Sequence, residues 1–324
     1  MRIAVMGAGG IGGFYGALLA RAGHEVILIA RGAHLAAIRR NGLTLTGDRE
    51  TFTVRPALAT ADTAEAGGHG PAELVLVTTK AYDLDGAARA LLPLVGPETL
   101  VLPLLNGVGI HQRLSGVLPE KQVLAGLTYL PAHRPAPGQV RHQGEQRRMV
   151  FGEPRGEPGG EPGGDSGGHS SRRCQALQKM LQDAGINAEL SNNMPYEIWR
   201  KFMMVNANGG ICSVSGEAVA SVLTDPDTRA LFEASCREVT ALAAQLGIVL
   251  EPALIDEILA MGQALPGDVK PSMLHDLEAG RPLELDTHAG AVTRMGAEMS
   301  VPVPVNAMIY ATLKHRAGGL KGPG

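Results

Sequence analysis

The sequence contains few aromatic residues, few cysteines and little excess charge of either sign. Phe, Trp and Tyr make up 3% of its 324 residues, and the formal net charge at pH 7 is -3. Domains that bind nucleic acids use a basic face or aromatic stacking platforms, so this composition argues against a nucleic-acid partner. The three cysteines, Cys174, Cys212 and Cys236, have neither C-x-x-C nor zinc-ligand spacing. We therefore expect reduced thiols and no metal site.

Two further features are absent from the sequence. It shows no signal-peptide pattern, and no apolar run is long enough to cross a bilayer. Hydrophobic residues make up 44% of the total, which is typical of globular cores, and the length favours two domains. We expect a cytoplasmic protein that acts on a small molecule and binds no membrane. The sequence is compatible with either a monomer or a homodimer.

The N-terminal region combines a short strand, a glycine-rich turn and a helix. An apolar strand over residues 3–6 runs directly into Gly7-Ala8-Gly9-Gly10-Ile11-Gly12, and a helical pattern follows as far as Ala22. A G-x-G-x-x-G turn in this context is typical of dinucleotide-binding proteins. Gly7 would allow the tight turn, Gly9 the approach of a pyrophosphate and Gly12 the packing of helix on sheet. The unpaired N–H groups and the dipole at the helix start favour an anion there.

The second predicted strand, over residues 25–30, ends at Arg31. An NAD-binding protein more often has an Asp or Glu at this point to hold the ribose hydroxyls. A guanidinium instead offers forked donors to a 2′-phosphate, and His34 or Arg39 are expected as additional donors. NADP(H) is therefore favoured over NAD(H). The alternative, a glycine-rich helix start followed by an ordinary exposed arginine, explains fewer of these features together.

Strand and helix patterns alternate through the rest of the first half. Strands are predicted over residues 42–45, 51–54, 73–79, 99–105 and 187–190, with further short strands between 126 and 152, and helices over 84–94 and 175–184. This alternation is typical of a doubly wound parallel sheet. Residues 153–171 consist largely of Gly, Pro, Glu and Ser, which predicts a disordered surface loop.

Strand patterns disappear in the second half of the sequence. Helices are predicted over residues 194–205, 228–246, 253–262, 286–299 and 305–315. The sequence thus predicts an α/β protein, with a Rossmann-type NADP-binding domain over 1–192 followed by an all-helical substrate-binding domain over 193–324. Ligands of open α/β sheets lie beyond the carboxyl ends of the strands. We therefore expect the substrate between the two domains.

Further motifs lie along nearly the whole chain. They are Thr79-Lys80-Ala81, Asn106-Gly107-Val108-Gly109, Pro137-Gly138 with His142 and Gly144, Trp199-Arg200-Lys201-Phe202, Ser272-Met273-Leu274-x-Asp276 and Glu284-Leu285-Asp286. In order and spacing, these motifs and the glycine-rich turn resemble the ketopantoate reductase (2-dehydropantoate 2-reductase) family of the 6-phosphogluconate-dehydrogenase-like group. The resemblance implies reduction of ketopantoate to pantoate by NADPH, a step of pantothenate and coenzyme A synthesis.

The resemblance also implies roles for individual residues. Lys201 matches the general acid of the family. Glu284 matches an acid that bonds the substrate hydroxyl and positions the lysine, and Ser272 matches a residue that binds the substrate carboxylate. Asn106 matches a residue that contacts both cofactor and substrate, and Lys80 matches a lysine that approaches the cofactor or the substrate.

Each of these residues also has an ordinary structural interpretation. Lys201 would be a lysine on a helix surface, and Glu284, like Asp286, an acid favoured by a helix N-terminus. Ser272 would cap a helix, Asn106 would belong to an Asn-Gly turn and Lys80 would be a solvated residue at a strand end.

The sequence departs from the family pattern after Lys201. Many members have asparagine four and eight residues further on, where this chain has Val205 and Gly209. Asn208 lies near the face of Lys201 and is expected to bind substrate if the helix continues, whereas Asn206 points away. Reduction of another 2-oxo or 3-oxo acid is therefore an alternative. A non-catalytic NADPH-binding sensor is an alternative of another class, which would not need both Lys201 and Glu284.

Overall fold

A parallel sheet forms the centre of the N-terminal half of the chain. In the computed structural model, which describes residues 1–48, 50–154 and 171–319, its strand order is β5-β2-β1-β6-β7. These strands are β1 (Arg2–Met6), β2 (Glu25–Ile29), β5 (Leu58–Thr60), β6 (Ala72–Val77) and β7 (Val95–Pro103). The strand order reverses direction between β1 and β6, so the turns after these two strands flank the point where open α/β sheets bind ligands.

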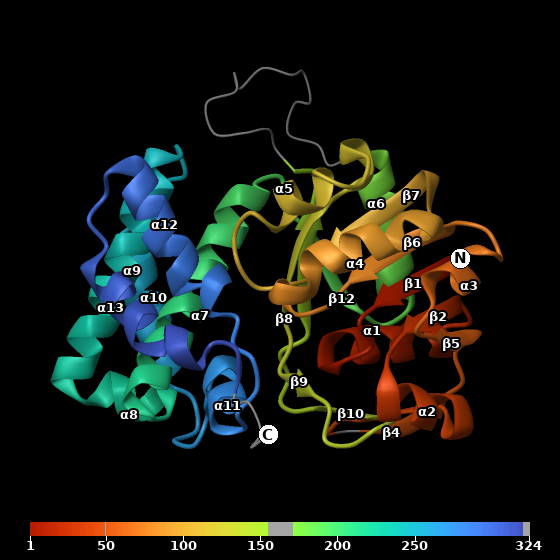
Figure 1. Cartoon of the computed structure of the whole chain (residues 1–324), viewed down its shortest axis with the longest axis horizontal. Coiled ribbons are helices and arrows are strands. Elements are labelled where there is room, and N and C mark those ends of the chain that lie inside the picture. Colours follow the sequence, from red (N-terminus) through yellow and green to blue (C-terminus); the bar gives the residue numbers. More distant parts are fainter. Residues whose placement is uncertain (49, 155–170, 320–324) are drawn as a thin grey trace. The chain divides into compact units, whose positions relative to one another are not determined.

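Both faces of this sheet are buried, which explains the apolar runs within its strands. Ile3 and Val5 face a core that includes α1 (Gly10–Arg21) and α6 (Arg172–Asp183). Ala4 and Met6 face a second core that includes α3 (Thr63–Gly67), α4 (Leu84–Leu91) and α5 (Ile110–Ser115). Helices thus cover both sides of the sheet (Figure 1). The predicted doubly wound fold is confirmed.

Two smaller sheets accompany the parallel sheet. One has the order β4-β3-β10-β9 and the other the order β12-β11-β8. Their strands are β3 (Leu43–Thr46), β4 (Thr51–Val54), β8 (Ala125–Tyr129), β9 (Ala132–His133), β10 (Gln139–His142), β11 (Arg148–Gly152) and β12 (Asn187–Leu190). Helix α2 (Gly32–Asn41) and strand β5 were not among the predicted elements. The helix predicted over 84–94 is interrupted: α4 ends at Leu91, and the short 3₁₀ turn η2 (Leu92–Leu94) contains Pro93, which lacks the N–H that an α-helix needs.

The C-terminal half consists of helices and connecting loops in its described residues. Its helices are α7 (Met194–Ser215), α8 (Val219–Thr224), α9 (Pro226–Gln245), α10 (Ala253–Gln263), α11 (Ser272–Glu278), α12 (Ala289–Met299) and α13 (Pro304–Leu313), with the 3₁₀ turns η4 (Leu285–Thr287) and η5 (Lys314–Arg316). Phe202, Phe232 and Ile309 belong to their common core. The predicted order, a sheet domain followed by helices, is confirmed.

Helix α7 is longer than predicted. It was expected to end at Val205, but it continues through two glycines to Ser215. A Cβ at Gly209 would lie 3.2 Å from Met273 Cε, and one at Gly210 would lie 2.9 Å from Ile309 Cδ1. These glycines therefore allow close packing of α7 against neighbouring side chains instead of ending the helix.

The chain divides into two units of dense internal contact. The first unit contains Met1–Leu105 and the described residues from 109 to 194, and the second contains Asn106–Val108 and the described residues from 195 onward. Asn106 thus groups with the helices although it lies three residues after β7 ends at Pro103. Of the loop predicted to be disordered over 153–171, residues 155–170 lie outside the described residues.

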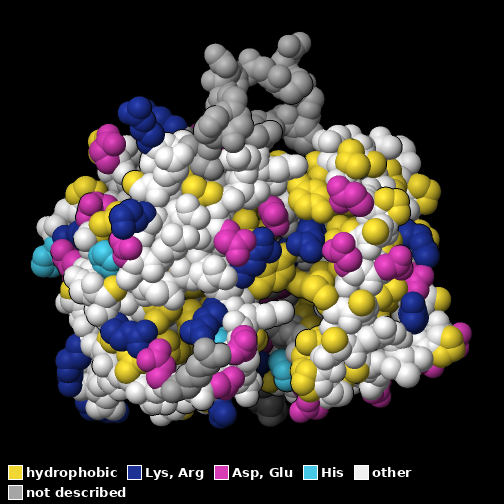
Figure 2. All heavy atoms as spheres, turned by 180° about the vertical axis from the view of Figure 1, so that it is seen from behind, with side chains coloured by type: hydrophobic (Ala, Val, Ile, Leu, Met, Phe, Trp, Pro, Cys, Tyr) yellow, Lys and Arg dark blue, Asp and Glu magenta, His cyan; other side chains and the backbone are white. Residues whose placement is uncertain are grey.

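Two surface properties bear on the composition. No helix in the described part of the chain has the length and hydrophobicity needed to span a membrane. On the face drawn in Figure 2, basic and acidic side chains are interspersed, in keeping with the net charge of -3.

Candidate functional site

The glycine-rich loop is tied to its surroundings through backbone atoms. The N–H groups of Gly7 and Ala8 both donate to the carbonyl oxygen of Ile29, each at 3.2 Å. Gly7 has φ +98°, a conformation that side chains other than glycine rarely adopt. A Cβ at Gly12 would overlap the carbonyl oxygen of Gly7 and the hydroxyl of Thr78. Gly7 and Gly12 thus have the structural roles that the motif predicts.

Gly9 and Gly10 differ from each other although they are neighbours. A Cβ at Gly9 would meet no atom within 4 Å, so space remains beside the backbone where α1 begins. A Cβ at Gly10 would instead overlap the carbonyl oxygen of Ala132 in β9. Gly10 is therefore required for packing, a role that the sequence did not indicate. The first turn of α1, which includes Ile11, has no acidic side chain, so the open space at Gly9 fits a phosphate.

The three residues predicted to bind a 2′-phosphate differ in availability. Arg31 is exposed at the start of α2, and its side chain makes no hydrogen bond or ion pair with any residue that the structure describes. His34 is only 4% exposed, and both of its ring nitrogens are engaged with the backbone of Ala8 and Gly138. The prediction that His34 donates to a phosphate is wrong, because its ring is buried and already bonded.

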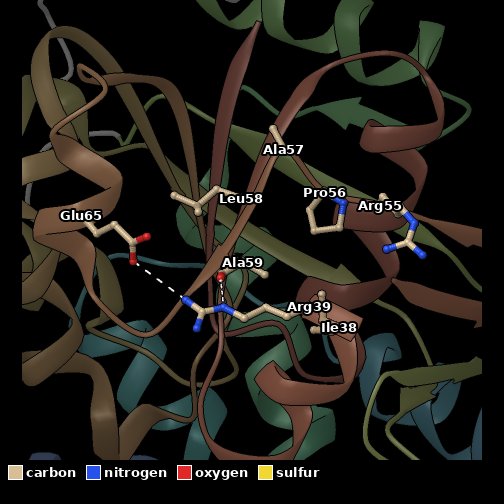
Figure 3. A pocket seen from close by; sticks show the side chains of 8 residues that line it. All are labelled: Ile38, Arg39, Arg55, Pro56, Ala57, Leu58, Ala59 and Glu65. Atoms are coloured by element: carbon tan, nitrogen blue, oxygen red, sulfur yellow. Dashed lines mark hydrogen bonds and ion pairs between the residues drawn. The ribbon is translucent and has the colours of Figure 1, made fainter. Parts of the chain in front are cut away.

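Arg39 is engaged on the side of α2 that faces β5. Its Nε donates to the carbonyl oxygen of Ala59 at 2.8 Å, and its Nη2 lies 3.9 Å from the carboxylate of Glu65. Figure 3 shows both interactions at a pocket that Arg55 and Leu58 also line. Of the three predicted donors, Arg31 is thus the one whose guanidinium has no protein partner among the described residues.

Lys201 is buried in the helical unit. Its residue exposure is 7%, and its Nζ donates to Oδ1 of Asn106 at 2.7 Å. Trp199 and Phe202, which flank it along α7, are buried with their rings edge to face. Burial lowers the pKa of Lys201 from 10.5 to about 8, and the negative charge of Glu284 opposes this shift. The interpretation of Lys201 as a surface lysine is therefore wrong.

Glu284 joins the same cluster from the segment before η4. It is 8% exposed, and its side chain forms no capping hydrogen bond to the turn that follows. Asp286 differs, because it is exposed and accepts a hydrogen bond from the hydroxyl of Tyr310 at 3.0 Å. The carboxylate of Glu284 is thus buried where its charge acts on Lys201, and it is not an ordinary helix-terminal acid.

The face of α7 beyond Lys201 contains one amide without a partner. Because α7 continues past Asn208, this residue lies near the face of Lys201, and its buried amide oxygen has no hydrogen-bond partner among the described residues. Asn206 points away, as predicted: its Nδ2 donates to Oδ1 of Asn306 at 2.7 Å. Val205 is half-buried, and Met273 packs over Gly209, so the remainder of this face is apolar.

The two remaining predicted site residues are Ser272 and Lys80. Ser272 is the exposed first residue of α11, whose N-cap is Pro271, so the interpretation of Ser272 as a helix cap is wrong. Lys80 is half-buried after β6 and belongs to the first unit, whereas Lys201, Asn106 and Glu284 belong to the second.

Comparisons with known proteins match almost the whole chain. Residues 3–156 match the family model described as ketopantoate reductase PanE/ApbA, and residues 193–317 match the model of its C-terminal part. A 2-dehydropantoate 2-reductase of Mesorhizobium japonicum is 31% identical over 338 residues, covering 98% of each chain.

Solved structures give the same result. A PanE/ApbA family ketopantoate reductase from Ralstonia eutropha JMP134 is 30% identical, with a TM-score of 0.85 and 98% of each chain covered. A D-mandelate dehydrogenase solved with NADH and anilino(oxo)acetate has a TM-score of 0.85 and 98% coverage of each chain at 24% identity, which establishes a shared fold.

Proposed function

Because the chain belongs to the ketopantoate reductase PanE/ApbA family of oxidoreductases, we propose that it reduces 2-dehydropantoate (ketopantoate) to pantoate with NADPH. This reaction is a step of pantothenate and coenzyme A synthesis. The observation that carries the proposal is Lys201, a buried amine bonded to Asn106 beside the charge of Glu284. Such a group suits proton transfer and has no evident use in a protein that only binds a dinucleotide.

Lys201 is the proposed general acid. NADPH, when bound, supplies a hydride for the ketone carbon. As the new C–H bond forms, the electrons of the carbonyl double bond move to oxygen, which takes a proton from the Lys201 ammonium. A pKa of about 8 keeps this amine mostly protonated at neutral pH while making its proton easier to release than that of an ordinary lysine. The neutral amine then regains a proton from water.

The neighbouring residues have proposed roles in positioning. Asn106 accepts a hydrogen bond from Lys201 and so limits the directions in which its ammonium points. Glu284 favours the protonated lysine and bonds the substrate hydroxyl. Asn208 offers its unpartnered amide to a polar group of the substrate, and Ser272 offers its exposed hydroxyl to the carboxylate.

The cofactor assignment depends on the first unit. Residues Gly7–Gly12 are proposed to hold the pyrophosphate, since the backbone at Gly9 is open and α1 begins there. Arg31 is proposed to bind the 2′-phosphate, because its exposed guanidinium has no partner among the described residues. Lys80 is proposed to approach the cofactor.

A second candidate substrate is a 2-oxo acid with an apolar side chain. Val205 and Met273 make part of the face beyond Lys201 apolar, and neither side chain hydrogen-bonds a hydroxyl as an amide would. A pocket without such a partner discriminates weakly in favour of a hydroxylated substrate.

A panel of 2-oxo acids assayed with NADPH and NADH tests both candidates through nicotinamide absorbance. The informative pair is 2-dehydropantoate and 2-oxoisovalerate, which differ by one hydroxymethyl group. We expect the highest kcat/KM for 2-dehydropantoate with NADPH. A higher value for 2-oxoisovalerate would favour the second candidate, and dinucleotide binding without turnover of any acid would favour a sensor.

A further inference from the structure

His34 connects the glycine-rich loop to a distant turn of the first unit. Its Nδ1 accepts a hydrogen bond from the backbone N–H of Gly138 at 2.9 Å, and its Nε2 lies 2.7 Å from the carbonyl oxygen of Ala8. A backbone N–H is always a donor, so Nδ1 has a lone pair and the imidazole is neutral. Nε2 therefore has the proton and donates it to Ala8. These two bonds together determine both the charge and the tautomer of the ring.

The two bonds fix groups that otherwise have few constraints. The N–H of Ala8 is already bonded to Ile29, and the bond from His34 holds the carbonyl oxygen of Ala8, so both backbone polar groups of this residue are fixed. Gly138 has φ +76°, and its carbonyl oxygen accepts the N–H of Thr44 in β3 at 2.9 Å. The ring of His34 thus links the loop to the sheet that contains β3 and β10.

We propose that His34 is a positioning residue for the dinucleotide, whose neutral ring holds the Ala8 carbonyl so that the loop is already ordered when a pyrophosphate binds. This inference rests on the proposed cofactor role of residues Gly7–Gly12. His34 contacts the loop and not the cofactor, so its effect should appear in cofactor affinity and not in the chemical step.

Protonation of His34 would oppose this arrangement. A proton on Nδ1 would face the N–H of Gly138, and that hydrogen bond would be lost. Burial lowers the pKa of His34 below its ordinary 6.5, the charge of Arg134 lowers it further, and the bond to Ala8 acts in the opposite direction. Ala8 and Gly138 contribute only backbone atoms. The ring is therefore neutral at pH 7, and the loop is expected to lose order only as the pH falls below about 6.5.

Two substitutions separate the role of the ring from that of its charge. His34→Ala removes both hydrogen bonds, and we expect Kd and KM for NADPH to rise about tenfold while kcat at saturating NADPH is unchanged. His34→Gln retains one acceptor and one donor but does not titrate. It should bind within about threefold of wild type near pH 7.5 and keep that affinity near pH 5.5. Wild type should lose affinity as the pH falls below 6.5 and His34 becomes protonated.

NADH is the informative ligand for the pH measurement. The 2′-phosphate of NADPH titrates near pH 6 and contributes its own pH dependence, whereas NADH lacks this group. Binding is measured by nicotinamide fluorescence. His69→Gln, at an exposed histidine of the same unit, is the matched control and should behave as wild type at both pH values.

The outcomes distinguish this inference from the proposed function. If wild type binds dinucleotide and His34→Ala binds it equally well, His34 has no positioning role although the cofactor assignment stands. The same conclusion follows if His34→Gln loses dinucleotide affinity on acidification as wild type does. If His34→Ala does not fold, this comparison of His34→Gln with wild type tests the inference by itself. If wild type binds neither NADPH nor NADH, the cofactor assignment itself is wrong.

Discussion

The glycine-rich loop and the Lys201 cluster are built from different parts of the chain. The loop consists of the consecutive residues Gly7–Gly12, and its shape is set by backbone conformation and backbone hydrogen bonds. The cluster brings together Asn106, Lys201 and Glu284, which are far apart in the sequence. A site built from local backbone is thus visible in a short motif, whereas a site built from distant side chains depends on the fold.

The two regions should also respond differently to change. The loop binds through neutral N–H groups and open space, so alterations there should change affinity or stability. The cluster contains a buried amine and a buried carboxylate, so alterations there should change turnover and its pH dependence.

Replacing Lys201 should produce the largest effect. Lys201→Ala removes the proposed proton donor, and we expect kcat for ketoacid reduction to fall about a thousandfold or more. The Kd for NADPH should change by less than about threefold, because Lys201 itself is not among the proposed cofactor contacts. Stopped-flow turnover and fluorescence titration measure the two quantities. Unchanged turnover would remove Lys201 from its proposed role.

The matched control for this substitution is the preceding cation. Arg200 is half-buried on α7, and its Nη2 pairs with Glu257 at 3.4 Å. Arg200→Ala should keep kcat within about threefold of wild type, because a partly exposed ion pair contributes little. A loss equal to that of Lys201→Ala would mean that the effect on turnover is not specific to Lys201.

A pair of glycine substitutions tests the loop. At Gly12 a Cβ would overlap the carbonyl oxygen of Gly7, so Gly12→Ala should lower the free energy of unfolding by about 1–3 kcal/mol. At Gly9 a Cβ meets no protein atom, so Gly9→Ala should leave the melting temperature unchanged and instead weaken NADPH binding about tenfold or more by occupying the phosphate space. Calorimetry and fluorescence titration separate these results. If Gly9→Ala bound NADPH as tightly as wild type, the assignment of this loop as the pyrophosphate site would be contradicted.

The parallel sheet was predictable because its strands are buried on both faces. Leu74–Val77 form an uninterrupted apolar run for this reason, and they lie within β6. The end of α7 was not predictable, since Gly209 and Gly210 resemble a helix terminus until Met273 and Ile309 are packed against them.

The candidate site was predictable to a smaller degree. The glycine motif indicated the loop by itself, but a lysine on a helix is usually exposed, and Lys201 was identified only through the family resemblance. The role of His34 has no local signal, because its partner Gly138 lies far along the chain. Contacts between distant segments are what the sequence alone does not specify.

Replacing Glu284 should shift the pH dependence. The negative charge of Glu284 raises the pKa of Lys201 against the effect of burial, so Glu284→Gln should lower that pKa below its value of about 8. Reduction requires the protonated amine, so in the variant the rate should begin to decline at a lower pH than in wild type. Near pH 8 the variant should be several-fold slower than wild type. A pH profile of kcat for reduction measures this. An identical profile in both proteins would show that Glu284 does not act on the proton donor.

Replacing Arg31 should change cofactor binding alone, and the effect should be specific to the 2′-phosphate. Arg31→Ala removes a guanidinium with no protein partner among the described residues, so stability should not change. A charge-assisted hydrogen bond contributes about 1.5–3 kcal/mol, so the Kd for NADPH should rise by at least about tenfold, while the Kd for NADH stays the same. Parallel titrations with the two cofactors measure the difference. Equal losses for NADPH and NADH would mean that Arg31 supports the loop as a whole, and the preference for NADPH would then need another source.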